Sequence, residues 1–122
     1  MPIVDILAVV ASPDDLPPRV AASIANALSP VFAASPGQVW VRLHWLPSSQ
    51  YAEDGTDISS DELPVFVSLL LATLPEDTAR QQQALSVCQI VATCLERPSH
   101  RVHLEYAAAG RGRVAFGGRL LT

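Results

Sequence analysis

Residues 2–10 have the sequence PIVDILAVV, a nearly unbroken apolar run that begins with a proline. A second run of the same kind, PVFVSLLLA, occupies residues 64–72. Continuous apolar runs of this length are typical of strands that are buried on both faces of a sheet. Each run is followed by a polar break that contains a proline, and then by a stretch with helical periodicity. The chain therefore presents one strand–helix pattern twice.

Both helical stretches carry apolar residues at three- and four-residue spacing, which predicts one buried face for each helix. The first helix is expected from Leu16 to about Ala34, with Asp15 as its N-cap. The second is expected to begin near the acidic residues 76–77, which suit a helix N-terminus. The residues predicted on the two buried faces are Val20, Ile24, Leu28 and Val31, and then Leu85, Cys88, Val91 and Leu95.

The two halves of the chain have matching prolines. Pro2 and Pro64 are 62 residues apart, and so are Pro36 and Pro98, each of which precedes a further extended run. This spacing predicts an internal duplication of a β-α-β unit. Right-handed crossovers place both helices on one side, so the expected fold is α+β, a four-stranded mixed sheet with two helices on one face. We expect a single domain over 1–122, with repeat one at about 2–47, a polar connection at 48–63, repeat two at about 64–107 and a C-terminal arm at 108–122.

The sheet face opposite the helices is covered by nothing in this chain. Because the strands look apolar on both sides, we expect these faces to pack together in a symmetric oligomer, a ring of three. The acidic composition, with a net charge of −4, argues against nucleic acid as a partner. No stretch approaches the length of a membrane-spanning helix, and the start of the chain lacks the pattern of a signal peptide. A cytoplasmic location is therefore predicted.

Amine chemistry is restricted to one position. All eight basic residues are arginine, so lysine-based covalent catalysis is excluded. Guanidinium groups keep their proton in proteins, which leaves the N-terminus as the one amine that can act as a base. Cys88 and Cys94 are six residues apart, a spacing that predicts neither a disulfide framework nor a metal site. We expect no metal and no organic cofactor.

Several short segments are similar, in order and spacing, to those of one family. They are MPIV at 1–4, LHWLP at 43–47, YAEDG at 51–55, SHRVHLEY at 99–106 and VAFGG at 114–118. Together with the repeat, they resemble the tautomerase superfamily, whose members include 4-oxalocrotonate tautomerase (4-OT) and macrophage migration inhibitory factor. The resemblance covers almost the whole chain. It implies the tautomerase fold and a homotrimer, with active sites at subunit boundaries around an N-terminal proline.

The resemblance also implies roles for individual residues. Pro2 would be the catalytic base, and Arg42 would bind a carboxylate of the substrate. His103 and Glu105 fall where the inhibitory factor lends a tyrosine and an asparagine from the adjacent subunit, and Phe116 falls at the aromatic wall of the pocket. The candidate substrate-binding residues are Trp40, Tyr51, His103, Glu105, Arg111, Arg113 and Phe116.

Two departures from the family pattern narrow the expected reaction. The helix-start arginine of 4-OT is missing from residues 12–15. The arginine pair that follows the third strand in the family's dehalogenases and decarboxylases is missing from residues 72–75. The specialised reactions of those relatives are accordingly not expected here.

A neutral N-terminal amine suits keto–enol chemistry. Chain α-amino groups have a reference pKa of about 7.7–8.0, and burial beside a cation disfavours their protonated form. We therefore predict a cofactor-independent tautomerase that acts on a small 2-oxo or 2-hydroxy acid. Two alternatives stay open. One is a ferredoxin-like regulatory domain, which has the same element order and binds ligands without catalysis. The other is a noncatalytic interaction module with the tautomerase fold, in which a retained Met1 would make the proline nitrogen an amide.

Overall fold

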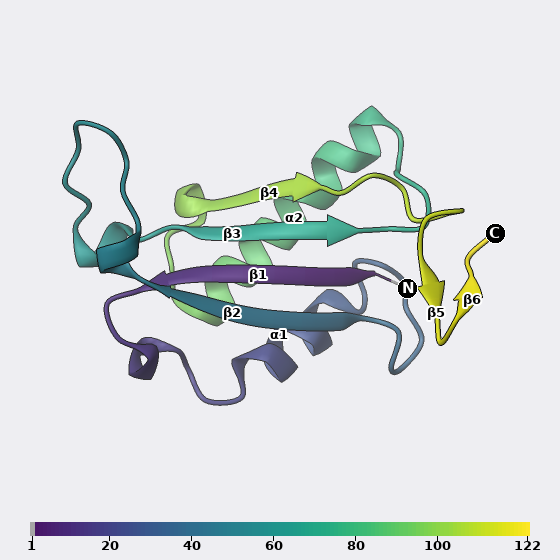
Figure 1. Ribbon diagram of the computed structural model, residues 1–122, viewed down its shortest axis with the longest axis horizontal. Coiled ribbons are helices and arrows are strands. Elements are labelled where there is room, and N and C mark those ends of the chain that lie inside the picture. Colours follow the sequence, from purple (N-terminus) through teal and green to yellow (C-terminus); the bar gives the residue numbers. More distant parts are fainter. Residues whose placement is uncertain (1) are drawn as a thin grey trace.

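A computed structural model describes residues 2–122 of the chain, so Met1 and the question of its removal lie outside the described residues. One four-stranded sheet organises these residues, with both helices on one of its faces (Figure 1). The strands are β1 (Ile3–Val10), β2 (Trp40–Pro47), β3 (Val65–Leu70) and β4 (Val102–Tyr106), and the helices are α1 (Val20–Leu28) and α2 (Asp77–Leu95). Short 3-10 turns occupy Pro13–Asp15, Ser48–Gln50, Ser60–Glu62 and Ser99–Arg101. The predicted fold class is confirmed.

The sheet has the strand order β2-β1-β3-β4. β1 runs parallel to β2 and antiparallel to β3, and β3 runs parallel to β4. The two β-α-β units therefore lie side by side and meet at the β1–β3 pair. This arrangement places the N-terminus at one end of a central strand, where the strand begins (Figure 1).

The core lies between the sheet and the helices. Alternate residues of β1, such as Val4 and Ile6, are fully buried beneath α1 and α2, as the period of a strand requires. The helices contribute Val20, Ile24, Leu28, Val87, Val91, Ala92 and Leu95 to the same cluster. Among residues 2–122, no helix combines the length and the apolar character needed to cross a membrane.

The first helix is shorter than predicted. α1 begins at Val20 and ends at Leu28 instead of covering residues 16–34. Ser12 and Asp15 cap a separate 3-10 turn instead, in which the Asp15 carboxylate accepts from the Ser12 amide at 2.9 Å. Pro17 and Pro18 follow this turn, and α1 begins only after Arg19, whose φ is 57°. Asp15 is therefore not the N-cap of α1.

The predicted buried face of the second helix is wrong at one position. Leu85 is 55% exposed, while Val87 and Val91 are fully buried. Leu85 and Val87 are about 200° apart around the helix axis, so both cannot face the sheet. Cys88 is partly buried at the edge of the core.

The C-terminal arm folds back on itself beside the start of β1 (Figure 1). It contains the short hairpin of β5 (Ala115–Phe116) and β6 (Arg119–Leu120). The Gly110 amide donates to the carbonyl of Leu71 at 2.7 Å, and the Leu121 amide donates to that of Val114 at 2.8 Å. The first bond fixes the arm to the chain that leaves β3, and the second closes the arm on itself.

The core assignment predicts a contrast between two leucine-sized side chains. Ile24→Ala should lower the free energy of unfolding by about 2–5 kcal/mol, because it opens a cavity beneath the sheet. Leu85→Ala should change it by about 0.5 kcal/mol or less, because that side chain is largely exposed. Urea denaturation of both variants checks the contrast, and equal losses would contradict the described helix orientation.

Candidate functional site

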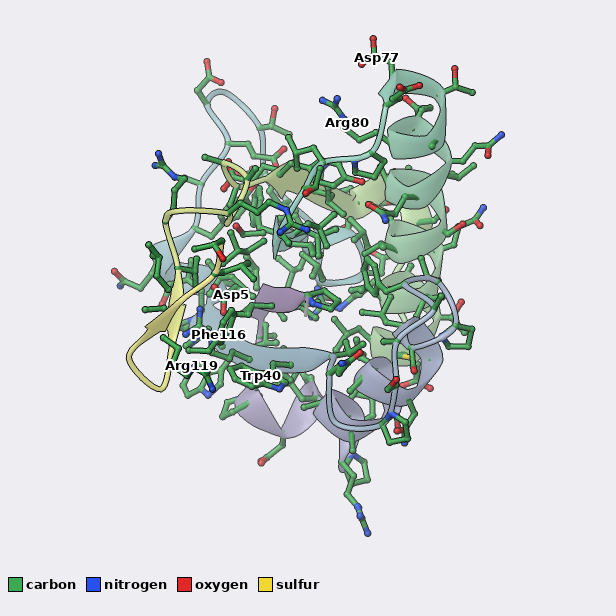
Figure 2. The ribbon with its side chains drawn as sticks, turned by 90° about the vertical axis from the view of Figure 1, so that its right-hand side faces the viewer. Asp5, Trp40, Asp77, Arg80, Phe116 and Arg119 are labelled. Atoms are coloured by element: carbon green, nitrogen blue, oxygen red, sulfur yellow. The ribbon has the colours of Figure 1, made fainter. Side chains whose placement is uncertain are left out.

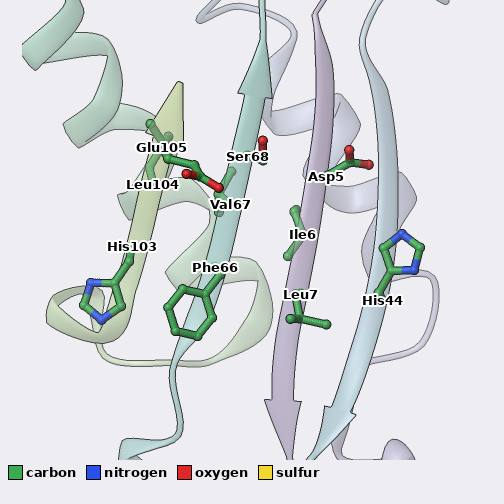
Figure 3. Close-up of a pocket in the computed structure, with 10 residues that line it drawn as sticks. All are labelled: Asp5, Ile6, Leu7, His44, Phe66, Val67, Ser68, His103, Leu104 and Glu105. Atoms are coloured by element: carbon green, nitrogen blue, oxygen red, sulfur yellow. The ribbon is translucent and has the colours of Figure 1, made fainter. Parts of the chain in front are cut away.

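The sheet face opposite the helices carries two cross-strand rows of side chains. The charged row is Glu105, Ser68, Asp5 and Arg42, and the histidine row is His103, Phe66, Leu7 and His44. Five of these eight side chains are ionisable, so the expectation that the strands are apolar on both sides is wrong for this face. Between the rows lies a shallow pocket of about 390 Å³ (Figure 3).

Arg42 is bound to a carboxylate of its own chain. Its Nε and Nη2 atoms donate to the two carboxylate oxygens of Asp5 at 2.5 and 2.7 Å. Arg42 and Asp5 are register partners on β2 and β1, which explains the close match. The bonds to Asp5 raise the pKa of Arg42. To hold a substrate carboxylate through the same two donors, Arg42 would first have to release Asp5.

Three predicted site residues come together at the start of β1. Pro2 is buried, and its carbonyl accepts from the amide of Trp40 at 3.0 Å. The Trp40 ring meets the edge of Phe116, with ring centroids 5.5 Å apart and planes at 85°. The Trp40 indole also donates to the carbonyl of Gly37 at 2.9 Å, which fixes its orientation. Figure 2 looks onto this end of the sheet, with Trp40 and Phe116 beside one another.

A second group of predicted residues forms around Phe66. The Tyr51 ring lies 6.0 Å from the Phe66 ring, and the His103 ring lies 5.6 Å from the Phe66 ring. The Tyr51 hydroxyl donates to Glu53 at 2.6 Å, and Arg101 donates to the same carboxylate oxygen. Arg101 chiefly, and Tyr51 in addition, hold the pKa of Glu53 below its usual value. Phe66 and Arg101 were not predicted as site residues.

The two groups are separated within one chain. The register places His103 level with Leu7, five residues along the sheet from Pro2. At a rise of about 3.3 Å per residue, this is a separation of about 16 Å along the strands, before the spacing between strands is added. A small organic acid cannot span that distance. Glu105, level with Asp5, is nearer to the N-terminal end but is two strands away from β1.

The arginines of the arm have different surroundings. Arg111 donates from Nε to the Thr73 hydroxyl at 2.9 Å and from Nη1 to the Thr122 carbonyl oxygen at 2.7 Å, so it braces the arm. Arg113 is exposed on the turn before β5. Arg119, which sequence reasoning did not single out, lies directly opposite Phe116 in the hairpin. The sequence feature that could have predicted this pairing is Gly117–Gly118 between them, because a Gly-Gly pair favours a two-residue hairpin turn.

No set of three or more histidine, cysteine or carboxylate side chains within residues 2–122 is arranged to hold a metal ion. Cys88 and Cys94 are both free thiols, and burial raises the pKa of each. Raised pKa values make these thiols poor nucleophiles at neutral pH.

Comparisons with known proteins identify the fold. No protein-family model and no curated protein matches the sequence. A fused 4-OT described as an asymmetric trimer matches with a TM-score of 0.78 and 13% identity, over 98% of this chain and 95% of that one. The macrophage migration inhibitory factor of Trichinella spiralis matches at 0.72 and 17%, over 97% and 98%. This chain has the tautomerase-superfamily fold. A further chain with this fold, inactivated by 2-oxo-3-pentynoate, matches at 0.77 and 15%, over 98% and 94%.

The tautomerase-superfamily fold accounts for the two β-α-β units and for nearly the whole length of the chain. Solved chains with this fold include enzymes, among them a member of the cis-3-chloroacrylic acid dehalogenase family. They also include assemblies described as trimers, both symmetric and asymmetric. At such low identities, the likeness establishes the fold, and the activity of this chain has to be argued from its own residues.

The bonds around Glu53 predict a pH-dependent contribution to stability. Its pKa is lower in the folded protein than in the unfolded chain, so the contribution is full above about pH 4.3 and is lost as the pH falls through the folded value. The difference in urea midpoint between wild type and Glu53→Gln should therefore be largest at pH 7 and shrink toward pH 3. Asp54→Asn, an exposed change in the same loop, is the control. A difference that stays constant with pH would contradict this.

Proposed function

We propose that this protein is a cofactor-independent tautomerase that uses the nitrogen of Pro2 as the base for keto–enol conversion of a small 2-oxo acid. The observation that carries the proposal is the position of Pro2. It is buried at the start of a central strand, where its carbonyl accepts from the amide of Trp40, and the Trp40 ring in turn packs against Phe116.

The proposed step needs one group that can both accept and return a proton. In the direction from enol to keto, the enol oxygen loses a proton, and the carbon of the double bond that does not carry this oxygen gains one. A secondary amine at the chain start can take up the first proton and deliver one to carbon, so it ends the cycle unchanged. In the proposed site, the Trp40–Phe116 ring pair would exclude water from one side of this position, and that would strengthen the electrostatic interactions there.

A second copy of the chain completes the proposed site. In one chain, His103 lies on the opposite part of the sheet from Pro2, and Glu105 is two strands away from β1. Both project from the face that the helices leave uncovered. If three such faces close into a ring, His103 and Glu105 of one subunit meet the N-terminal end of the next. Trimers among solved chains with this fold support this arrangement.

One observation favours the alternative of a noncatalytic binding module with the same fold. Arg42, the residue expected to bind the substrate carboxylate, is paired with Asp5 through two hydrogen bonds. A carboxylate-binding enzyme then needs another cation near Pro2, and a module that only binds partners does not. Kinetics decides between the two.

Replacement of Pro2 tests the proposal. The enol-to-keto conversion of phenylpyruvate should show a kcat/KM that falls by at least about 100-fold in Pro2→Ala, because a positioned base contributes on that scale. Intact-mass measurement of both proteins must show that Met1 has been removed, and circular dichroism must show equal folding. Equal rates in wild type and Pro2→Ala, with Met1 absent from both, would eliminate the proposed base.

Mixing of inactive variants tests the shared site. Pro2→Ala and a His103→Ala/Glu105→Ala double variant should each be nearly inactive alone. After they are unfolded together and refolded as one mixture, about one quarter of the sites should combine an intact Pro2 with an intact His103 and Glu105 from its neighbour. The kcat/KM per chain should therefore recover to about one quarter of the wild-type value. A mixture no more active than its components would contradict a site shared between subunits.

A further inference from the structure

The charged row of the uncovered face crosses the whole sheet and carries opposite charges at its two ends. β4 and β2 are the outer strands, so the Glu105 carboxylate is at one edge and the Arg42 guanidinium at the other. The register places both on one level, with Ser68 and Asp5 between them. Figure 3 shows Glu105, Ser68 and Asp5 at this level on three strands.

Both ends of the row have bonding capacity left. Glu105 is exposed and takes part in none of the ion pairs formed within the part of the chain that the structure describes. Arg42 donates to Asp5 from Nε and Nη2, and 62% of its side chain is exposed. Its Nη1 atom is not used in that pair, and a guanidinium has five N–H donors. Arg42 can therefore bind a second carboxylate without releasing Asp5.

Apolar side chains flank the row in both directions along the central strands. They are Leu7 and Phe66 on one side, and Ile3 and Leu70 on the other. Phe66 is 37% exposed, and Trp40, level with Ile3, is 51% exposed. A partner that covers these side chains also removes the charged row from water, where an unpaired charge is costly and a matched pair is stronger. The face therefore fits a partner that brings a matching charge.

A second copy of this chain supplies that charge. In a ring of identical subunits, each contact joins two different patches, so one edge of a subunit meets the opposite edge of the next. Rotation about an axis that runs along the strands keeps every residue at its level. Glu105 of one copy then comes to the level of Arg42 in the next. A two-fold dimer made through equal edges would instead bring like charges together, which is unfavourable.

We propose that Arg42 is an assembly residue whose guanidinium binds Asp5 of its own chain and Glu105 of a second copy at once. The pair makes the head-to-tail contact of a ring specific for this chain. Arg42 then has a role at the subunit interface in place of the substrate-binding role that the resemblance implies. This inference rests on the ring of the proposed function, and it does not depend on Pro2 acting as a base.

The exchange of subunits between rings measures this contact. Native mass spectrometry of a mixture of isotope-labelled and unlabelled protein shows the size of the rings and the rate at which mixed rings appear. Glu105→Gln should raise this rate at least about 10-fold, as expected for the loss of hydrogen bonds between charged groups. Glu105→Arg should raise it at least about 100-fold or abolish the rings, because two guanidinium groups would then meet.

A second background separates pairing from a general effect of charge. In Asp5→Asn/Arg42→Gln the partner charge is absent, so adding Glu105→Gln should no longer raise the exchange rate. An equal rise in both backgrounds would overturn the pairing. Glu96→Gln and Glu96→Arg are the matched controls, because Glu96 is exposed at the end of α2 and forms no ion pair within residues 2–122. Their exchange rates should stay within about twofold of wild type.

These measurements need no substrate, so they are independent of the test of the proposed base. Rings that exchange at the wild-type rate in Glu105→Gln would overturn the pairing and leave the ring and Pro2 in place. A wild type that forms no rings would overturn both the ring and the pairing, and the Pro2→Ala kinetics would still decide on the base. Circular dichroism shows whether Glu105→Arg folds, and if it does not, the Glu105→Gln comparison decides alone.

Discussion

The pairing of β1 between β2 and β3 is the constraint on which the described structure depends. Its register sets Asp5 opposite Arg42 on one side and Ser68 on the other, on the face that the helices leave uncovered. A shift of one residue would turn Asp5 into the core and bring Val4 and Ile6 out of it. The same register fixes the chain start beside Trp40. The register that packs the core therefore also places the N-terminal site.

Sequence reasoning succeeded where a long, simple pattern decides the structure. The runs at residues 2–10 and 64–72, together with the proline spacing, predicted the sheet and both crossovers. Helix boundaries were less well predicted, because the apolar period around residues 16–34 continues through turns that prolines and caps remove from the helix. The orientation of α2 depends on its packing against the sheet. A stripe through Leu85 fits the sequence, yet the packed helix buries Val87 and Val91.

The candidate site was predictable only in part, for a related reason. Pro2 and Phe116 were singled out through resemblance and Trp40 as a ring that would exclude water, and Trp40 contacts both of the others in the fold. The Arg42–Asp5 pair joins residues 37 positions apart, which no local pattern reveals. Tyr51 and His103 were singled out individually, but their placement around Phe66, away from Pro2, follows from register alone.

The central claim is that the nitrogen of Pro2 is a reactive, uncharged amine. 2-Oxo-3-pentynoate tests it directly, because a neutral amine adds to the alkyne carbon remote from the carbonyl. An N–C bond forms, one π bond of the alkyne breaks, and the proton lost from nitrogen is balanced by one taken up at the neighbouring carbon. A solved chain with this fold is inactivated by that compound. Peptide mass mapping of the treated protein should locate one adduct per chain on Pro2. An adduct elsewhere, or none when the N-terminus is free, would contradict the account.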